Sequence, residues 1–191
     1  MFFKNEKYLL GKPSLIDALK QILQVEHFSI EKDQQYIYKL ECQNPRAIVL
    51  CENLDFLTKP NKPRQYGIEL WYAGGKNIQK LNYSNTRGLP IFYSCDWDYD
   101  GLYIHSLIKS ILVDIQLLTP NGQPKSIQQT EHKSFWRNVH DPSILSQIDA
   151  SHFNSEQQEL LKDLITNNQW IIEESNDLIQ MLDIAHLFNA S

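Results

Sequence analysis

Three aspartates occur at alternate positions in the segment S-C-D-W-D-Y-D-G, which spans residues 94–101. Asp96, Asp98 and Asp100 directly follow an apolar stretch, and a glycine closes the run. Carboxylates this close repel one another and have raised pKa values unless a cation lies between them. Carboxylate oxygens are the ligands that hard divalent cations prefer. The run therefore predicts a site for a divalent cation.

A fourth acid, Glu52, follows another apolar run, A-I-V-L-C at residues 47–51. The parallel strands of an open α/β sheet end at one edge, and sites form where the loops beyond that edge converge. If the two apolar runs are neighbouring strands, Glu52 and Asp96 meet there. A cation at this point would polarise a phosphoryl oxygen and lower the pKa of a bound water. Glu52 would then serve as a ligand, a general base or a general acid.

The elements that must position these acids can be predicted from periodicity. Alternating or continuous apolar residues predict strands, and apolar stripes at helical spacing predict helices. The strands are expected at residues 35–41, 47–51, 68–73 and 89–95, and the helices at 15–23 with Ser14 as cap, 102–112, 155–165 with a capping box from Ser155 to Gln158, and 169–187. The polar stretch 118–135 predicts a long loop. Short strands alternating with helical segments favour an α/β fold with a mostly parallel central sheet.

Composition limits the possible functions. The chain has 42% hydrophobic and 21% charged residues, which is ordinary for a soluble globular protein, and no apolar run long enough to span a membrane. The first residues lack the order of a signal peptide, so we expect a cytoplasmic protein. The formal charge of −5 argues against a broad basic surface that holds nucleic acid unaided.

Cysteine usage and domain division complete this outline. Cys42, Cys51 and Cys95 show no paired metal-ligand spacing, and we interpret them as reduced, mostly buried thiols. The expected division is an appendage over residues 1–45 and an α/β domain with a helical extension over residues 46–191.

Other sites share part of the aspartate pattern. An EF-hand loop that began at Asp96 would need a glutamate at its twelfth position, where Leu107 stands. A phosphatase motif of the D-x-D-G-T type would need threonine in place of Leu102. A solvated acidic turn is a third interpretation, and for Glu52 an acid that stabilises a helix N-terminus is another.

The segments V-L-C-E-N-L-D-F, L-W-Y-A-G-G-K-N and F-Y-S-C-D-W-D-Y-D-G-L-Y-I occur in that order. A glutamate after one strand, a Gly-Gly after the next and D-x-D-x-D-G after a third resemble the Toprim domain. The resemblance covers about residues 46–115 and is greatest to the Toprim of topoisomerase VI A subunits and of the JetD nuclease subunit of the Wadjet anti-plasmid system. It implies a Rossmann-like, mostly parallel sheet flanked by helices, with extra N- and C-terminal helices.

The resemblance also implies roles for single acids. Glu52 matches the Toprim glutamate, which is a general acid or base or a metal ligand. Asp96 and Asp98 match the D-x-D pair that holds Mg²⁺ or Mn²⁺. Asp100 matches a frequent third acid. The later segment W-I-I-E-E-S, residues 170–175, is similar to a glutamate-rich segment of the JetD-like group.

Roles for the remaining motif residues stay open. Gly74 and Gly75 match the glycine turn at which the Toprim backbone approaches nucleic acid, and an ordinary turn is the alternative. Lys76 is a candidate phosphate contact or one of several scattered surface cations. Glu173 and Glu174 either face solvent on a helix or complete a second metal site.

The function implied is Mg²⁺- or Mn²⁺-dependent DNA endonuclease activity, acting with a partner ATPase resembling structural-maintenance complexes in DNA defence or processing. The chain has no G-x-x-x-x-G-K-[ST] motif of its own, so a partner would supply any ATP hydrolysis. The residues upstream are too few for a domain that delivers a tyrosine nucleophile, which favours hydrolysis by water. The alternatives are a non-catalytic DNA-binding or scaffold subunit and phosphatase or primase chemistry. A homodimer is possible.

Overall fold

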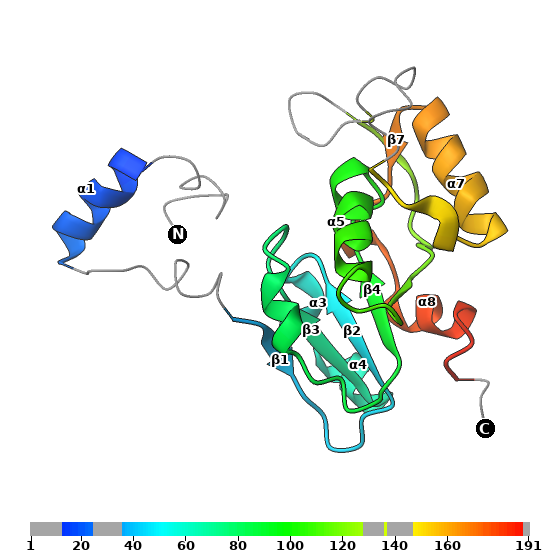
Figure 1. Ribbon diagram of the computed structural model, residues 1–191, viewed down its shortest axis with the longest axis horizontal. Helices are drawn as coiled ribbons and strands as arrows, with labels where there is room; N and C mark the ends of the chain where they lie inside the picture. The colour runs from blue at the N-terminus through cyan, green and yellow to red at the C-terminus, as the bar shows by residue number, and fades with distance from the viewer. Residues whose placement is uncertain (1–12, 25–35, 128–135, 137–146, 189–191) are drawn as a thin grey trace. The chain divides into compact units, whose positions relative to one another are not determined.

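The structure, a computed structural model, describes residues 13–24, 36–127, 136 and 147–188 (Figure 1). The chain divides into two compact units, Met1–Tyr36 and Ile37–Ser191. In the first unit, helix α1 spans Pro13–Leu23, so Ser14 lies inside the helix and is not its cap as predicted. The helix predicted over residues 15–23 is therefore present. Ile22, a member of its apolar stripe, is largely exposed.

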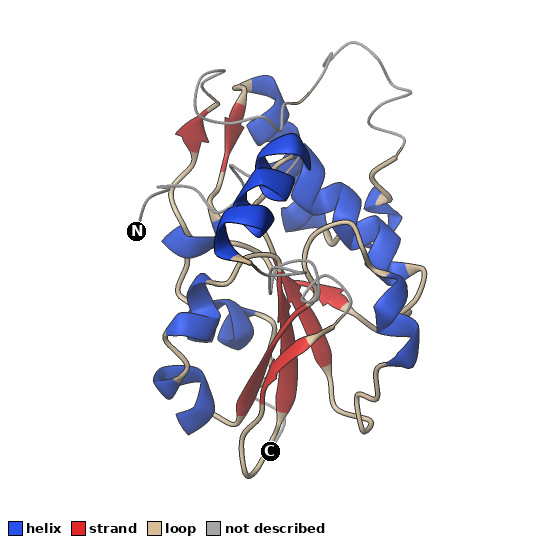
Figure 2. Cartoon of the chain, turned by 90° about the vertical axis from the view of Figure 1, so that its left-hand side faces the viewer, coloured by secondary structure: helices blue, strands red, loops and turns tan. Residues whose placement is uncertain are grey.

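The second unit is built on a five-stranded mixed sheet (Figure 2). The strand order is β1-β3-β2-β4-β5, with β2, β3, β4 and β5 parallel and β1 antiparallel to β3. The strands are β1 (Tyr38–Leu40), β2 (Ala47–Cys51), β3 (Ile68–Tyr72), β4 (Ile91–Ser94) and β5 (Gln116–Leu117). The predicted α/β fold with a mostly parallel central sheet is therefore confirmed, and this sheet is compatible with a Rossmann-like fold.

Short helices and a second small sheet surround the five strands. The helices are α3 (Asp55–Thr58), α4 (Asn61–Gln65), η2 (Gln79–Tyr83), α5 (Tyr99–Lys109), η3 (Ala150–His152), α7 (Ser155–Thr166), η4 (Glu173–Ser175) and α8 (Leu178–Ile184). The second sheet pairs β6 (Lys125–Ser126) with β7 (Gln169–Trp170). No helix of the described residues is both long and apolar enough to cross a bilayer.

Strand β2 lies at the centre of the sheet and is buried on both faces. Ile48 and Leu50 pack on the face that helix α5 covers, and Ala47 and Val49 pack on the face that α8 covers. A strand between two helical layers needs apolar residues at every position, which is why residues 47–51 form a continuous apolar run. Because both faces of β2 are packed, the position of its carboxyl end is fixed.

Several predicted helix boundaries are wrong. Helix α5 spans Tyr99–Lys109 where residues 102–112 were predicted. Helix α7 is capped by a box between Asn154 and Gln157, one residue earlier than predicted, since the Asn154 side chain accepts the Gln157 N–H. The predicted helix over 169–187 begins only at Leu178, where the Asp177 side chain caps α8. Of the residues before it, Gln169–Trp170 form β7 because they pair with β6, and Glu173–Ser175 form the short 3-10 helix η4.

The other sequence-level expectations have mixed outcomes. All three cysteines are free; Cys51 and Cys95 are buried and Cys42 is half-buried. The predicted loop 118–135 contains β6, and its residues 128–135 lie outside the described part of the chain.

Candidate acidic site at the carboxyl edge of the sheet

The neighbouring strands β2 and β4 bring Glu52 and Asp96 together. Cys51 lies opposite Ser94 in the register, and the Glu52 N–H donates to the Ser94 carbonyl oxygen at 2.9 Å. Both chains then leave the sheet side by side. The Asp96 N–H donates to Glu52 Oε2 at 3.1 Å. The structure thus places the glutamate against the start of the aspartate run, as two adjacent parallel strands require.

Asp98 and Asp100 lie in different surroundings. Asp98 is 3% exposed and caps helix α5, because its Oδ1 accepts the Gly101 N–H at 2.8 Å. Asp100 lies in the first turn of the helix and is half-exposed; its Oδ1 accepts from Lys76 Nζ at 2.9 Å. The second aspartate therefore has a structural role already, and the third faces a cation of the protein itself.

Gly101 ends the aspartate run because no side chain fits at this point. A Cβ atom on Gly101 would lie 2.1 Å from the Asp96 carbonyl oxygen and 2.8 Å from Glu52 Oε2. Contacts under 3.0 Å of this kind do not occur in proteins, so the backbone of α5 can approach the Glu52 carboxylate only with glycine here. The glycine keeps the helix start and the two acids together.

Glu173 is the site residue that sequence reasoning did not place. Of the two interpretations left open by the sequence, the solvent-facing helix is wrong for Glu173, which is 1% exposed and begins η4, whereas its neighbour Glu174 is exposed. An antiparallel bridge between Trp97 and Ile171 draws this segment to the aspartate run. The two isoleucines before the glutamates were the available sequence signal, since they indicate a buried extended segment.

Three hydrogen bonds from backbone N–H groups to carboxylate oxygens connect Glu52, Asp96 and Glu173, and the last of them returns to Asn53, the residue after Glu52. Glu52 Oε2 accepts the Asp96 N–H, Asp96 Oδ1 accepts the Glu173 N–H at 2.7 Å, and Glu173 Oε2 accepts the Asn53 N–H at 2.7 Å. We call Glu52, Asp96, Asp98 and Glu173 the acidic cluster. Glu52, Asp96 and Glu173 thus each have one carboxylate oxygen bonded to a backbone N–H of a chain segment far away in the sequence.

The cluster holds buried negative charge without basic partners for two of its members. Burial raises the pKa of Glu52 well above its usual value, and the charges of Asp96, Asp98 and Glu173 raise it further. Burial likewise raises the pKa of Glu173; hydrogen bonds from the Ser94 side chain and the Asn53 N–H act in the opposite direction, and the charges of Asp96 and Glu174 raise the pKa further. Neither Glu52 nor Glu173 forms an ion pair with a lysine or arginine within the described residues. Ionised carboxylates in this environment require a cation.

The donor chemistry of the cluster fits a hard divalent cation, but its present arrangement is not a finished metal site. Among the described residues, no three His, Cys, Asp or Glu side chains are placed so that they could hold a metal ion. Cation binding therefore requires Glu52 and Asp96 to turn away from their N–H donors toward a common point.

The Gly-Gly turn lies next to this edge, after β3. Gly74 and Gly75 both have positive φ angles, +74° and +60°, which L-residues rarely adopt. Nothing lies within 4 Å of the place where a Gly75 Cβ would be, so the backbone is open to a ligand there. The turn also places Lys76 against Asp100, which links the glycine turn to the aspartate run.

Lys80 and Arg87 are two further basic residues close to the glycine turn in the sequence, and Lys80 Nζ lies 3.6 Å from the place where a Gly74 Cβ would be. Arg87 pairs with Glu69, a fully buried carboxylate of β3. Burial lowers the pKa of Lys80, so this lysine is partly withdrawn from solvent. Lys76 is therefore the basic residue of this group that lies beside the aspartates.

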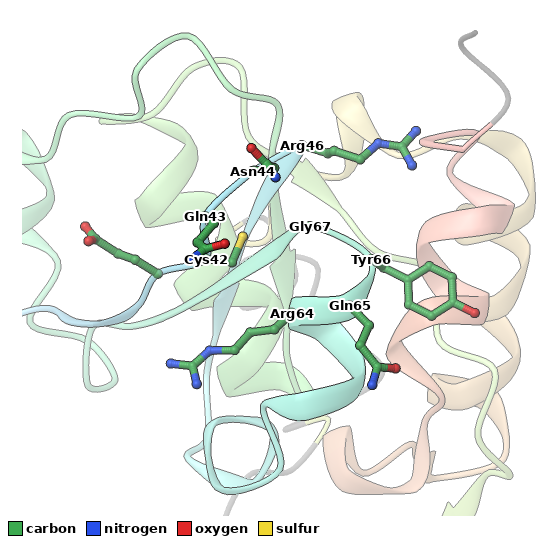
Figure 3. A pocket seen from close by; sticks show the side chains of 9 residues that line it. Cys42, Gln43, Asn44, Arg46, Arg64, Gln65, Tyr66 and Gly67 are labelled. Carbon is green, nitrogen blue, oxygen red and sulfur yellow. The ribbon is translucent and has the colours of Figure 1, made fainter.

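A hollow with a volume of about 770 Å³ opens at the opposite, amino edge of the sheet (Figure 3). Its lining includes Cys42, Asn44, Arg46, Arg64 and Gly67. Figure 3 shows the side chains of Arg46 and Arg64 pointing in different directions. The Arg46 guanidinium lies over the ring of Phe188, at 5.3 Å from its centroid. The two arginines thus do not converge on one point.

Comparison with known proteins adds no relative. No protein-family model matches the chain, and no curated protein matches it. The Toprim resemblance therefore remains a prediction from the quoted motifs.

Proposed function

We propose that this protein is a Toprim-type, Mg²⁺- or Mn²⁺-dependent endonuclease that hydrolyses DNA phosphodiester bonds. The observation that carries the proposal is the meeting of Glu52 with Asp96 at the ends of two parallel strands. Acids 44 positions apart, one of them buried enough to have a strongly raised pKa, are typical of a site that does chemistry. The sheet edge is also where α/β proteins bind ligands.

The roles of the residues follow from their surroundings. Asp96 and Asp98 would hold the cation, with Glu52 as a further ligand or as the proton-transfer group. A carboxyl group whose pKa is raised above its usual value is a stronger base, which can take a proton from water and return one to a leaving oxygen. When bound, Mg²⁺ would supply Lewis-acid activation of the phosphate and charge neutralisation among the carboxylates.

The glycine turn and Lys76 would bind the DNA backbone. Gly75 leaves the turn open to approach, and the Lys76 ammonium group lies at the edge of the aspartate run. A phosphate at this point would compete with Asp100 for the lysine. Because the whole chain carries a net charge of −5, we propose that DNA affinity depends on the bound cation and on a partner. That partner would be a cytoplasmic ATPase complex in DNA defence or processing.

The proposal is tested by incubating supercoiled plasmid with Mg²⁺ or Mn²⁺ and the purified chain. We expect nicking that Asp96→Ala and Glu52→Ala each reduce at least about 100-fold, because each removes a group on the reacting centre. Asp114→Ala is the matched control, since Asp114 is an exposed aspartate outside the cluster. Cleavage that persists in Asp96→Ala would show that the cluster is not the catalytic site.

A second candidate function is a non-catalytic DNA-binding or scaffold subunit. One observation favours it: the carboxylates of the described residues do not form a ready cation site. In that case the native chain does not nick plasmid with either cation, alone or with its partner complex, and its DNA binding is unchanged by Asp96→Ala. Release of phosphate from an aryl phosphate ester would instead favour phosphatase chemistry.

A further inference from the structure

Helix α5 carries two stacked tyrosine rings close to the acidic cluster. Tyr99 and Tyr103 lie in the first and second turns of the helix, with ring centroids 6.1 Å apart and an interplanar angle of 12°. Residues four positions apart in a helix lie on one face, so the two rings form one surface. The N-terminal turn of α5 approaches the Glu52 carboxylate at Gly101. The rings therefore lie within about two helical turns of the acids.

The two rings are held in place but are only half-buried. They pack at the margin of the core, whereas the buried face of α5 is formed by residues such as Leu102, Ile104 and Ile108. The Tyr99 hydroxyl donates to Gln147 Oε1 at 2.7 Å, which fixes the orientation of this ring. Part of a fixed aromatic surface is thus exposed to solvent beside the cluster.

Two lysines accompany the tyrosine pair. Lys76 Nζ lies 5.7 Å from the centroid of the Tyr103 ring and donates to Asp100 Oδ1 at 2.9 Å, and its side chain is more than half exposed. Lys80 Nζ lies 3.6 Å from the place where a Gly74 Cβ would be. Both ammonium groups are therefore found at the glycine turn, and one of them lies against the aromatic surface.

Aromatic rings beside cations fit one form of nucleic acid better than the other. Unpaired bases stack on aromatic side chains while basic residues contact the phosphates. A duplex presents only the edges of its bases, so it gains nothing from a tyrosine ring and is held mainly through many phosphate contacts. Lys76 and Lys80 do not make a broad basic surface, and the chain has a net charge of −5. This surface therefore fits an unpaired strand.

We propose that Tyr99, Tyr103, Lys76 and Lys80 form a binding surface for an unpaired DNA strand, which we call the tyrosine surface. Bases of the strand stack against the rings, and its phosphates contact the two ammonium groups. The proposal rests on the proposed function in taking DNA as the ligand, and it narrows the substrate to DNA with an unpaired segment. A supercoiled plasmid offers such segments, because negative supercoiling favours strand separation.

The test measures binding of the full chain to two labelled probes by fluorescence anisotropy. One probe is a strand of about 12 deoxythymidines, which cannot pair with itself, and the other is the same strand with its complement. Ca²⁺ is present as a hard cation that carboxylates bind, and the probes are checked for cleavage afterwards. The native chain should bind the single strand at least about fivefold more tightly than the duplex.

Substitutions of one ring show whether stacking causes this preference. Tyr103→Leu keeps an apolar side chain but removes the ring, so we expect at least about fivefold weaker binding of the single strand and little change for the duplex. Tyr103→Phe keeps the ring and should lose less affinity than Tyr103→Leu. Tyr66→Leu is the matched control, because Tyr66 is an exposed tyrosine at the amino edge whose ring also contacts another ring, that of Phe188.

The outcomes separate the tyrosine surface from the nuclease. Equal single-strand affinity of the native chain and Tyr103→Leu would overturn the surface and leave the nuclease proposal intact if the native chain nicks plasmid. Weaker binding in Tyr103→Leu together with no nicking by the native chain would support the surface and contradict the nuclease. A native chain that binds the duplex as tightly as the single strand, or binds neither probe, would overturn the surface. If Tyr103→Leu does not fold, as urea unfolding would show, Tyr99→Leu is measured in its place by the same criterion.

Discussion

The two edges of the sheet treat buried carboxylates differently. Glu69, toward the amino edge, is fully buried, and the Arg87 guanidinium pairs with it. Glu173, at the carboxyl edge, is as deeply buried but has only uncharged donors, the Asn53 N–H and the Ser94 side chain. The first carboxylate is neutralised by the protein and holds a loop in place. The second has no basic partner within the described part of the chain, so burial raises its pKa and favours its neutral form.

The arginines of the hollow extend the same comparison. Arg64 forms no side-chain hydrogen bond or ion pair within the described residues, and its guanidinium is free to move in solvent. The charge of an exposed arginine is hydrated, so it costs the folded state little free energy and does not require a bound ligand. About 13 Å of strand β2 separates this hollow from the acidic cluster, given a rise of about 3.3 Å per residue.

The largest effect is expected at Gly101, where the carboxyl edge is packed most closely. Gly101→Ala should lower the free energy of unfolding by at least about 3 kcal/mol, because the new methyl group meets the Asp96 carbonyl oxygen. The helix propensity of alanine would by itself give a gain of about 1 kcal/mol, so the sign is informative. Urea unfolding measures the change.

Gly75→Ala is the control for this substitution. The site is open, and only the positive φ angle disfavours alanine, at a cost of about 1–2 kcal/mol. Equal losses in the two variants would mean that the carboxyl edge is no more tightly packed than the glycine turn.

The second prediction concerns His105, whose contribution to the pH dependence of stability can be distinguished from that of the acidic cluster. Burial lowers the pKa of His105 to about 4, with Lys109 and His152 contributing, and neither ring nitrogen has a hydrogen-bond partner. The unfolded chain takes up this proton near pH 6.5 and the folded chain only near pH 4. Stability due to neutral His105 is therefore present above pH 6.5 and falls by on the order of 3 kcal/mol as the pH decreases to 4.

The measurement is the free energy of unfolding from pH 8 to pH 4 for the native chain and for His105→Leu. The leucine variant should lack the loss on the acidic side, so the difference between the two curves isolates His105 from the carboxylates. Parallel curves would show that His105 is not buried in its neutral form.

The third prediction concerns the paired carboxylate toward the amino edge. Arg87→Ala leaves buried Glu69 without its partner and should cost about 2 kcal/mol, below the full value for a buried pair because Arg87 is partly exposed. Arg64→Ala, in the hollow, should change stability by less than about 0.5 kcal/mol. Thermal unfolding of the two variants compares them. Similar losses would remove the distinction between paired and unpaired charge at this edge.

The smallest effect is expected at Glu173 and has the opposite sign. The raised pKa means that the folded chain retains this proton to higher pH than the unfolded chain, so the stability it contributes is present at low pH and lost as the pH rises through the folded value. Without divalent cations at pH 8, Glu173→Gln should therefore be more stable than the native chain by about 1 kcal/mol.

This gain should disappear toward pH 4, where the native carboxyl group is protonated, and should be absent in Glu174→Gln. Chemical unfolding in EDTA at both pH values tests it. A loss of stability at pH 8 would show that Glu173 is compensated in the folded chain without a cation.

The sequence predicted four of the five strands of the sheet and three of the four members of the acidic cluster. Strand β2 could be recognised because a strand covered on both faces must be apolar throughout, and Glu52 and Asp96 could be placed together because parallel strands end at one edge. Both arguments need only local patterns and one rule of topology.

Glu173 could not be predicted in the same way. Its segment reaches the cluster through a bridge between Trp97 and Ile171, a pairing of residues 74 positions apart that no local periodicity reveals. The residues that follow have helical spacing, and this pattern extended the predicted helix back over β7 and η4. The cap of α7 was missed by one residue since Asn154 and Ser155 are both good caps and only backbone geometry separates them.

The bond between Asn53 and Glu173 spans 120 positions of the chain, which has a consequence for synthesis on the ribosome. While residues 37–127 emerge and begin to fold, the acidic residues at the ends of β2 and β4 lack Glu173, the fourth member of the cluster. The site closes only after residue 173 has left the ribosome and found its place, a late and non-local step of folding. A nascent chain would thus have no competent site.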